Sequence, residues 1–575
     1  MSFVIGSTPN DSASGGRSRL FLPAGCAALL AVLVYLNALD NPFVYDDFPL
    51  IVENTSILNA SDIRSVIERD ITRPIVTLSY ALDTWLWGQR PLGYHATNLL
   101  LHIVNVLLMF WVAVLASEDR ARQAGQRLWV DASPRVVGFV TSAVLAVHPM
   151  MTQAVGYISG RSEVAYSAFF LLAFLAGRRW MLGGDARWWL ACVGLWVVAI
   201  LAKESAVMLP FVLLVYERVV LDADRSERRR RLMRLLLPMI VATVVAGAGR
   251  VAVLMLVEYP GEAGVDWRLA LVAVDAFWRY LLMLFSPRGQ SIFHAVPFID
   301  SLLSPRAIGG LIGLAGLVAV ACRLRRVHSL VTFGLLWFAL LLVPSSALLV
   351  LGLGEPMAEH RVYLSAAGLF LTWGCAFSVM WVRADRRKFA AAGAALFLAA
   401  LAFQTVVRNA IWEDPVELSQ EAVNLAPGHW MPRILAADAL RQSGRCEDAV
   451  PQYRAAILIR PVDEYPYTML ARCLIVGQRL TEAEETLRQL RVLHPASQDA
   501  SMGLGVFALL GGRPKESRAH FQDVLDRDAG RAQAKLMLAF IDGSLPASER
   551  GQLCEALRTV AGASTPIEVC PVVAP

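Results

Sequence analysis

Charged residues are scarce in this chain of 575 residues. Only 18% are Asp, Glu, Lys or Arg, whereas 56% are hydrophobic and the mean hydropathy is +0.50. A single soluble domain is neither this long nor this apolar, so the composition excludes that class. Apolar runs of about 20 residues recur along the chain, and that length crosses a bilayer core roughly 30 Å thick. The sequence therefore predicts an all-α, polytopic membrane protein.

Eleven apolar runs are candidate membrane spans. They are residues 20–39, 96–117, 136–155, 163–177, 188–202, 205–217, 235–256, 306–322, 329–351, 362–382 and 389–408. Short basic loops lie between alternate runs: Arg120/Arg122/Arg127, Arg178/Arg179/Arg187, Arg218 to Arg234, Arg323/Arg325/Arg326 and RADRRK at 383–388. Such loops usually remain in the cytoplasm, so the intervening loops and everything after residue 408 are expected outside. The net charge of +5 then reports orientation and does not indicate nucleic acid.

Two segments leave alternatives open. Residues 269–285 are apolar enough to span, but a span there would move the basic residues 323–326 to the outer face. We expect residues 257–305 to be an outer region whose middle is re-entrant or interfacial; the alternative is an ordinary extra span. The polar, Gly/Ser-rich residues 1–19 are expected to be disordered in the cytoplasm. Residues 20–39 are interpreted as an uncleaved signal anchor, with a cleaved signal peptide as the alternative.

The tail, residues 409–575, differs from the basic part before it. It has 17 Lys and Arg against 21 Asp and Glu, and it repeats every 34 residues. The repeating columns are Ala449/Ala483/Ser517, Tyr453/Leu487/Phe521, Ala437/Ala471/Gly505 and Pro427/Pro461/Pro495. Small, aromatic and proline positions at this period are the tetratricopeptide signature. We therefore expect about four stacked helix pairs, a solenoid outside the cytoplasm, after a membrane domain of residues 20–408.

Cysteine is also sparse, and no C-x-x-C occurs, so no familiar zinc spacing is present. Four of the eight cysteines fall in or at spans. The other four, Cys446, Cys473, Cys554 and Cys570, are in the tail. Outside the cytoplasm they could form two disulfides, and the sequence leaves all three pairings open.

The outward-facing loops carry charged residues close to the apolar runs. The first loop, residues 40–95, contains FVYDDF with the adjacent acids Asp46 and Asp47. Charges this close to hydrocarbon are expensive unless they are paired or functional. Because all four such loops carry them, we predict a polar cavity lined by Tyr45, Arg73, His95, Asn98, His102, His148, Glu163, Glu204, Glu359 and His360. Individual Arg and Lys residues could instead extend their charged ends to the interface.

Several of these cavity residues come from one helix face. His95, Asn98, His102 and Asn105 recur at i, i+3, i+7 and i+10. This stripe could form a polar wall or could simply hydrogen-bond neighbouring helices. The histidines could bind a divalent ion together with Asp46 and Asp47, but no spacing selects a metal site, so no cofactor is predicted.

Acids beside cations at a membrane surface suit a lipid-phosphate substrate. Arg161, Lys203 and Arg361 are the candidate phosphate ligands, because Arg and Lys bind phosphate oxygens well. A carboxylate could act as general base toward an acceptor hydroxyl. Nearby cations would keep that acid ionised while weakening it as a base.

Six motifs in this order resemble a known family: VYDDFPLIVEN, TRPIVTLSYALD, GYHATNLLLH, HPMMTQAVGYISGRSE, LAKESAVMLP and AEHRVYL, followed by the repeats. The set is similar to the transmembrane and tetratricopeptide-repeat-containing glycosyltransferases, related to protein O-mannosyltransferases of the GT-C class. The resemblance covers residues 40 to 530. It implies a GT-C fold and transfer of a sugar, mannose or another hexose, from a polyprenyl-phosphate donor to a hydroxyl of an extracytoplasmic protein or glycan, with inversion.

The resemblance also implies roles for the paired acids. Asp46 would be the general base, and Asp47 would position the acceptor or the base. The repeats would present the acceptor. The chain has fewer repeats than the animal members, and its Ala- and Arg-rich composition favours a bacterial inner-membrane protein, so donor sugar and acceptor are not carried over. Two other hypotheses compete: a non-catalytic, membrane-anchored repeat scaffold, which would not need the paired acids, and a transporter, which would need charges near the bilayer midplane.

Overall fold

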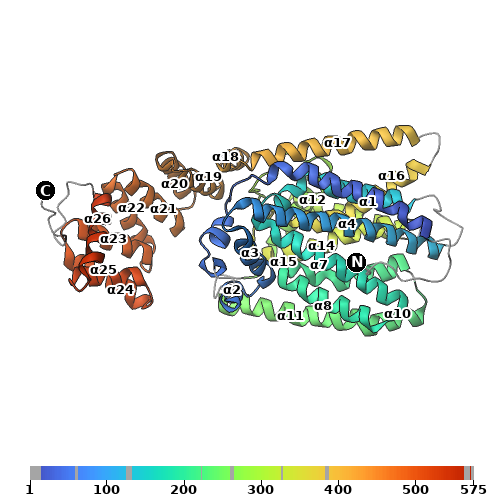
Figure 1. The fold of residues 1–575 in the computed structure, drawn as a ribbon, viewed down its shortest axis with the longest axis horizontal. Helices are drawn as coiled ribbons and strands as arrows, with labels where there is room; N and C mark the ends of the chain where they lie inside the picture. Colours follow the sequence, from blue (N-terminus) through green and yellow to red (C-terminus); the bar gives the residue numbers. More distant parts are fainter. Residues whose placement is uncertain are drawn as a thin grey trace. The chain divides into compact units, whose positions relative to one another are not determined.

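The computed structural model describes residues 14–58, 62–124, 133–221, 223–258, 264–325, 328–382, 387–561 and 570. The chain divides into two compact units, Met1–Pro415 and Val416–Pro575. Within the described residues both units are built from helices, and no strand occurs (Figure 1). The predicted all-α class is confirmed.

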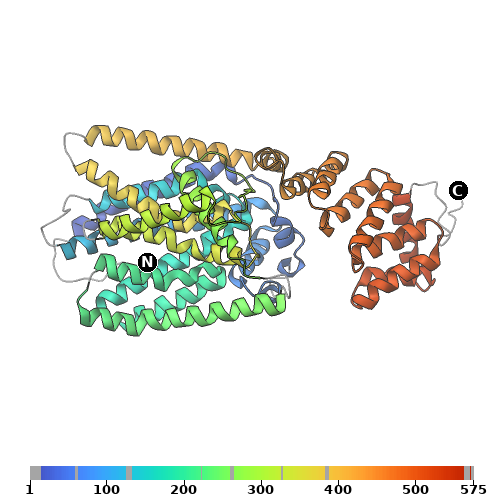
Figure 2. The ribbon, with the colours of Figure 1, turned by 180° about the vertical axis from the view of Figure 1, so that it is seen from behind.

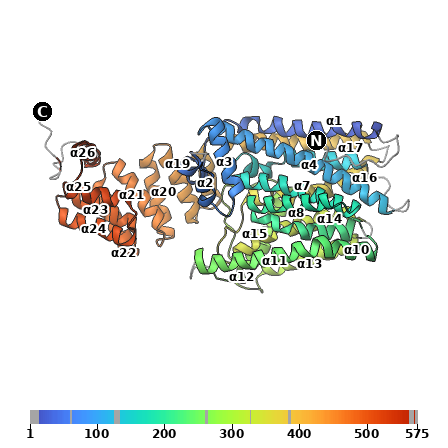
Figure 3. The same cartoon turned by 60° about the horizontal axis from the view of Figure 1, so that its bottom comes forward.

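The first unit is a bundle whose long helices run side by side (Figures 1 and 2). Its helices are α1 Ser14–Tyr35, α2 Ile63–Arg69, α3 Pro74–Trp87, α4 Pro91–Ala124, α5 Pro134–Val147, α6 Thr152–Val155, α7 Arg161–Gly183, α8 Ala186–Ala202, α9 Leu209–Tyr216, α10 Arg225–Arg231, α11 Leu237–Val253, α12 Arg268–Phe285, α13 Pro305–Leu324, α14 Ser329–Leu341, α15 Val343–Val350, α16 Tyr363–Val382 and α17 Arg387–Ile411. The short α2 and α3, both from the first loop, lie at one end of the bundle (Figure 3).

Eight helices in the described residues are long and apolar enough to cross a membrane, or nine if α5 and the Pro149–Val155 segment, bent by 60°, form one span. The sequence suggested eleven. The difference includes α8, a shorter apolar helix, and α9, which has only eight residues before the helix widens at Glu217–Leu221. The helix α12, for which we expected an interfacial or re-entrant position, is not among the eight.

Some predicted boundaries move. The first helix begins at Ser14, inside the stretch expected to be disordered, while residues 1–13 lie outside the described part. Parts of four predicted basic loops also lie outside it: residues 125–132, 222, 326–327 and 383–386. The helix α17 continues to Ile411, three residues beyond the expected end of the membrane domain.

Close helix packing in the first unit depends on small residues. At the contact of α14 with α16, a Cβ on Gly334 would lie 2.3 Å from the Gly368 carbonyl oxygen, and a Cβ on Gly368 would lie 2.5 Å from that of Gly334. Small residues let membrane helices approach this closely. The neighbouring layer is aromatic, with Phe170, Phe333 and Trp337 packed edge to face. Close packing against α14 fixes α16, which begins at Tyr363, shortly after His360 and Arg361.

The second unit is a row of helix pairs. Its helices are α18 Pro415–Leu425, α19 Trp430–Gln442, α20 Cys446–Ile459, α21 Glu464–Val476, α22 Leu480–Leu493, α23 Gln498–Leu510, α24 Pro514–Arg527, α25 Ala532–Ile541 and α26 Ala547–Ala561. The first helices of the pairs, α19, α21, α23 and α25, begin at the predicted 34-residue period. The repeating small and aromatic positions are buried, and a Cβ on Gly505 would lie 2.7 Å from the ring of Phe521. The sequence pattern therefore specifies this packing.

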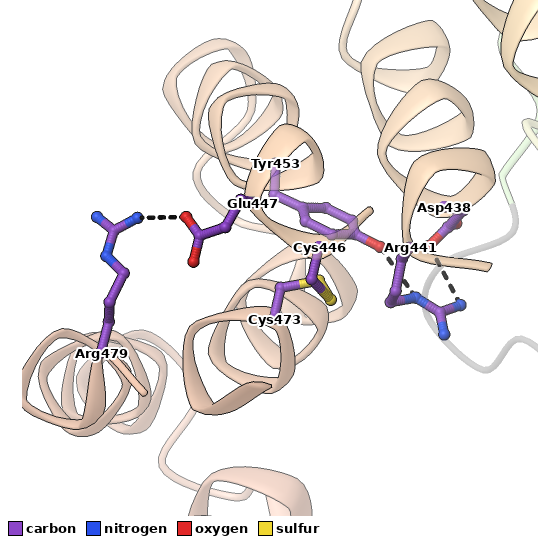
Figure 4. Close-up of a disulfide and its surroundings, with 7 residues drawn as sticks. All are labelled: Asp438, Arg441, Cys446, Glu447, Tyr453, Cys473 and Arg479. Carbon is purple, nitrogen blue, oxygen red and sulfur yellow. Dashed lines mark hydrogen bonds and ion pairs between the residues drawn. A yellow bond between two sulfur atoms is a disulfide. The ribbon is translucent and has the colours of Figure 1, made fainter. Parts of the chain in front are cut away.

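Two disulfides select one of the three open pairings. Cys446 at the start of α20 bonds Cys473 on α21, and Cys554 bonds Cys570. Figure 4 shows the first disulfide between the two helices, with Tyr453 nearby. The Tyr453 hydroxyl donates to Asp438 at 2.6 Å, which joins α20 to α19. Adjacent repeats are thus joined covalently as well as by packing.

Candidate active site

One cavity of about 230 Å³ collects polar residues from loops that are far apart in the sequence. Of the predicted site residues, its walls include Tyr45, Asp46, Arg73, Lys203, Glu204, His360 and Arg361. These residues come from the first, third and last of the loops predicted to face outward, and Gln153 adds the second. The structure thus brings together groups that in the sequence share only their predicted side of the membrane.

A tight turn aims Asp46 into the cavity. Tyr45 has a φ of +48°, a left-handed conformation that is uncommon for a residue with a side chain. The Asp46 backbone N–H donates to the Tyr157 hydroxyl at 3.0 Å. Burial raises the pKa of Asp46, while the Tyr157 hydrogen bond and the Arg73 charge oppose that rise. Asp46 is therefore a carboxyl group held in place by its backbone with its side chain on the cavity.

Asp47 points the other way and is fully buried. One carboxylate oxygen accepts the Val44 N–H at 3.0 Å, and the other accepts the Ser159 N–H at 2.9 Å and its hydroxyl at 2.5 Å. Burial raises its pKa to about 7, although these hydrogen bonds favour the ionised form. Asp47 does not line the cavity, and its bonds fasten the first loop to the start of α7.

Two cavity cations are already paired with carboxylates. Arg73, directly before α3, binds Glu204 through Nη2 at 3.0 Å and Nε at 3.3 Å. Burial would raise the pKa of Glu204, but Arg73 and Lys203 lower it to about 2. The Lys203 Nζ lies 2.6 Å from Glu163, which is buried and does not line the cavity. These pairs keep four charges beside the cavity at little net charge.

The last loop supplies a cation with a different partner. Arg361 donates through Nη1 to the Glu355 backbone carbonyl at 2.6 Å. The neighbouring His360 backbone N–H donates to Gln153 at 2.7 Å. Glu359, predicted for the cavity wall, is buried instead and accepts hydrogen bonds from the segment after α12: Gln290 Nε2, the Ser291 N–H and His294 Nε2. It fixes the loop that carries His360 and Arg361.

Arg161 is the clearest correction to the predicted phosphate ligands. Its side chain is fully buried and does not reach the cavity. Nη1 lies 2.5 Å from Asp83, Nε donates to Asn98 at 2.8 Å, and Nη2 donates to the Tyr94 carbonyl at 2.8 Å. The guanidinium nitrogens of Arg161 therefore already have partners within the protein, and these contacts join α7 to α3 and α4.

The polar stripe of α4 forms hydrogen bonds to neighbouring parts of the protein, which is the second of the two interpretations that the sequence left open. His95 Nε2 contacts the Asn41 carbonyl at 3.0 Å, Asn98 donates to the carbonyls of Tyr157 and Ile158, and His102 Nδ1 lies 2.7 Å from the Tyr363 hydroxyl. His148, from the second loop, contacts the Leu284 carbonyl at 2.9 Å. None of these four lines the cavity. In the described part of the chain, no three His, Cys, Asp or Glu side chains are placed to hold a metal ion.

Several cavity residues were not predicted for the site: Tyr157, Ser205, Ile292, Ser345, Leu348, Glu355 and Ala358. Tyr157 and Glu355 lie within outward loops that were recognised as polar, so a search of whole loops would have included them. Ile292 comes from the segment after α12 and Ser345 and Leu348 from α15, and the sequence carries no signal that these approach the first loop.

These features define a class: a multi-pass, all-helical membrane protein whose first unit contains a polar cavity lined by its loops, and whose second unit is a repeat solenoid. A sequence profile of the tetratricopeptide repeat matches residues 434–490 and 468–532. Among solved structures, the crystal structure of the APC/C hetero-tetramer Cut9–Hcn1 aligns over 84% of this chain and 92% of its own at 13% identity, with a TM-score of 0.22, which is too low to bear on the fold.

Several relatives of this chain are named protein O-mannosyl-transferases. Protein O-mannosyl-transferase Tmtc1 of Drosophila melanogaster is 34% identical over 214 residues, 35% of this chain and 23% of its own. Tmtc3 of the same organism is 23% identical over 562 residues, covering 85% and 60%. Human TMTC1 is 24% identical over 510 residues, covering 76% and 55%. The chain spans less than two thirds of the length of each of these relatives. The predicted resemblance to the transmembrane, repeat-containing O-mannosyl-transferases is confirmed, because these proteins are homologues of the chain.

Proposed function

We propose that this protein is a membrane glycosyltransferase that moves a hexose from a polyprenyl-phosphate donor to a hydroxyl of an extracytoplasmic protein or glycan. The relatives are named protein O-mannosyl-transferases, so mannose is the first donor sugar to test. The observation that carries the proposal is the cavity, where Asp46 faces Arg73, Lys203 and Arg361. A base and cations around a small space suit transfer from a phosphate leaving group.

The chemistry assigns each group a role. Asp46 removes the proton from the acceptor hydroxyl, whose oxygen bonds the anomeric carbon from the opposite face and inverts it. The bond from that carbon to the phosphate oxygen breaks, and its electron pair leaves with the polyprenyl phosphate. Arg361 is the first phosphate ligand, because Arg73 and Lys203 are bound to Glu204 and Glu163. Asp47 positions the turn that carries Asp46.

The location of the site follows from the basic loops and the tail. Cytoplasmic basic loops would place the cavity and the solenoid on the extracytoplasmic side. The two disulfides of the tail favour that side, since thiols stay reduced in the cytoplasm. The solenoid would recruit the acceptor, because stacked repeats offer an extended binding surface.

The test is sugar release from purified protein in lipid, with a panel of labelled polyprenyl-phosphate sugars, a hydroxyl-bearing acceptor peptide and the variant Asp46→Asn. Transfer from one donor is expected, with a loss of at least about 100-fold in Asp46→Asn, the usual scale of a missing general base. The matched control is Glu413→Gln, a carboxylate outside the cavity, which should transfer at the wild-type rate. Equal rates in wild type and Asp46→Asn would contradict the assignment, and binding of acceptor without donor turnover would favour the scaffold.

A further inference from the structure

Most carboxylates around the cavity are already engaged. Glu204 is bound by Arg73, Glu163 by Lys203, and Glu359 by the segment after α12. Asp47 accepts three hydrogen bonds from Val44 and Ser159. None of these four is available to a substrate without breaking a protein contact.

Two carboxyl groups remain on the cavity, Asp46 and Glu355. In the described part of the chain, no Arg, Lys or His nitrogen lies within ion-pair distance of either one. They come from loops at opposite ends of the first unit's sequence, yet they line a space of only about 230 Å³. The charge of Asp46 raises the pKa of Glu355, so ionising both carboxyl groups costs more than ionising one of them.

Their surroundings decide which one keeps the proton. Burial raises the pKa of Asp46 as well, but the two further effects at that acid, the Tyr157 hydrogen bond and the Arg73 charge, both favour its ionised form. The pKa of Glu355 is raised by burial first and also by the charge of Asp46, against the opposing charges of Arg361 and His294. Environments that favour the charged form of one acid over the other assign the base and the proton donor.

Glu355 is also on the side where the phosphate is expected. Its backbone carbonyl holds the guanidinium of Arg361, the first phosphate ligand, at 2.6 Å. An ionised carboxylate there would repel a phosphate, whereas a neutral carboxyl group can donate a hydrogen bond to it.

We propose that Glu355 contacts the donor phosphate as a neutral carboxyl group, donating its proton in a hydrogen bond beside Arg361 while Asp46 remains the ionised base. This inference rests on the proposed function. No covalent bond forms at Glu355: its proton is shared with a phosphate oxygen when the donor binds and stays on the carboxyl group when polyprenyl phosphate leaves. Donor binding therefore depends on the protonation of Glu355.

The test is the affinity of the purified protein in nanodiscs for polyprenyl phosphate, measured between about pH 5 and about pH 9, a range that brackets raised carboxyl pKa values. Above the pKa of Glu355, wild-type affinity should fall by about tenfold per pH unit relative to Glu355→Gln, because one proton is then taken up with the ligand. The amide keeps a hydrogen-bond donor and has no charge to lose. The other titratable and charged groups on the cavity are the same in both proteins: Tyr45, Asp46, Arg73, Tyr157, Lys203, Glu204, His360 and Arg361.

The matched control is Glu204→Gln, the same substitution at a carboxylate of the same cavity whose pKa is lowered to about 2. It should alter the affinity at every pH but leave the pH dependence of wild type. Identical pH dependence in wild type and Glu355→Gln would overturn the inference while leaving sugar transfer intact. Absence of polyprenyl-phosphate binding by every protein at every pH would overturn the proposed donor as well as the inference.

Discussion

At the scale of single residues, the adjacent acids Asp46 and Asp47 have opposite surroundings. Asp47 offers two oxygens to three donors, and an amide in its place would direct an NH₂ group at one of them. We expect Asp47→Asn to lower the free energy of unfolding by about 1–3 kcal/mol, the cost of an unsatisfied buried donor. Thermal unfolding in detergent measures it, with Asp46→Asn as the control that should unfold near the wild-type temperature. Equal unfolding of both variants would contradict these roles.

The pH dependence of stability provides a second prediction at Asp47. Burial raises its pKa to about 7 in the folded protein, whereas an unfolded chain has an Asp pKa near about 3.9. The folded state therefore binds more protons between these values, so this stabilising contribution is complete below about pH 4 and is lost as the pH rises through about 7. Unfolding temperatures of wild type should fall over that range, and the fall should shrink in Asp47→Asn. A variant with the full wild-type slope would contradict the prediction.

Arg161 and Arg361 are a matched pair of arginines with different expected defects. Removing the buried Arg161 leaves the Asp83 carboxylate with a hydrogen bond from Thr97 but without its charged partner, so Arg161→Ala should cost about 3–5 kcal/mol of stability. Arg361 lines the cavity, and among the described residues its side chain donates to one backbone carbonyl, so Arg361→Ala should unfold near the wild-type temperature but lose affinity for polyprenyl phosphate. Unfolding and binding assays on both variants check this. A stable Arg161→Ala protein with impaired binding would restore Arg161 as a phosphate ligand.

At the scale of helices, the contact of α14 with α16 has room for glycine alone. We expect Gly334→Ala to separate the two helices and destabilise the protein by about 1–3 kcal/mol, the usual range for overpacking. Gly316→Ala on α13, where a Cβ meets nothing within 4 Å, is the control and should be neutral. Thermal unfolding in detergent compares them. Sugar transfer should fall with Gly334→Ala as well, because α16 begins beside Arg361.

Helix types and repeats could be predicted from the sequence because periodicity records burial directly. The columns Tyr453/Leu487/Phe521 and Ala449/Ala483/Ser517 repeat at the 34-residue period and are buried in the second unit. Span lengths were less accurate. The helix α8 ends at Ala202 as predicted, but a 3-10 segment at Glu204–Met208 delays the start of α9 and leaves it only eight residues. The period of a pattern specifies packing within an element, and it does not specify where the element stops.

The candidate site was only partly predictable for a related reason. Charge near hydrocarbon signals that a residue is paired or functional, but the sequence does not show which partner is near. Arg161 is paired with Asp83 from 78 positions earlier in the chain, while Arg361 forms no ion pair among the described residues and donates to the Glu355 backbone carbonyl. Glu355 lies within a loop that the sequence marks as polar, but only the fold shows that it lines the same cavity as Asp46. Only the three-dimensional structure shows which charged side chains are paired and buried, as Arg161 is, and which line the cavity, as Arg361 does.

At the scale of the whole molecule, the disulfides test both the stability and the location of the second unit. Cys446 and Cys473 close a loop of 27 residues. Constraining the unfolded chain in this way stabilises by about 3.5 kcal/mol in the chain-entropy account, so Cys446→Ser with Cys473→Ser should lower the unfolding temperature of the solenoid. Cys322→Ala, at a free cysteine of α13, is the control and should not.

The same four cysteines report which side of the membrane the solenoid occupies. If it lies outside the cytoplasm, thiols blocked in intact cells before lysis should leave Cys446, Cys473, Cys554 and Cys570 unmodified, and reduction should then expose all four to a mass tag. Free tail thiols in the trapped protein would place the solenoid in a reducing compartment. Because α17 joins the solenoid after passing the bundle, that result would also invert the proposed side of the cavity, and the polyprenyl-phosphate donor would then have to reach Asp46 from the cytoplasmic leaflet.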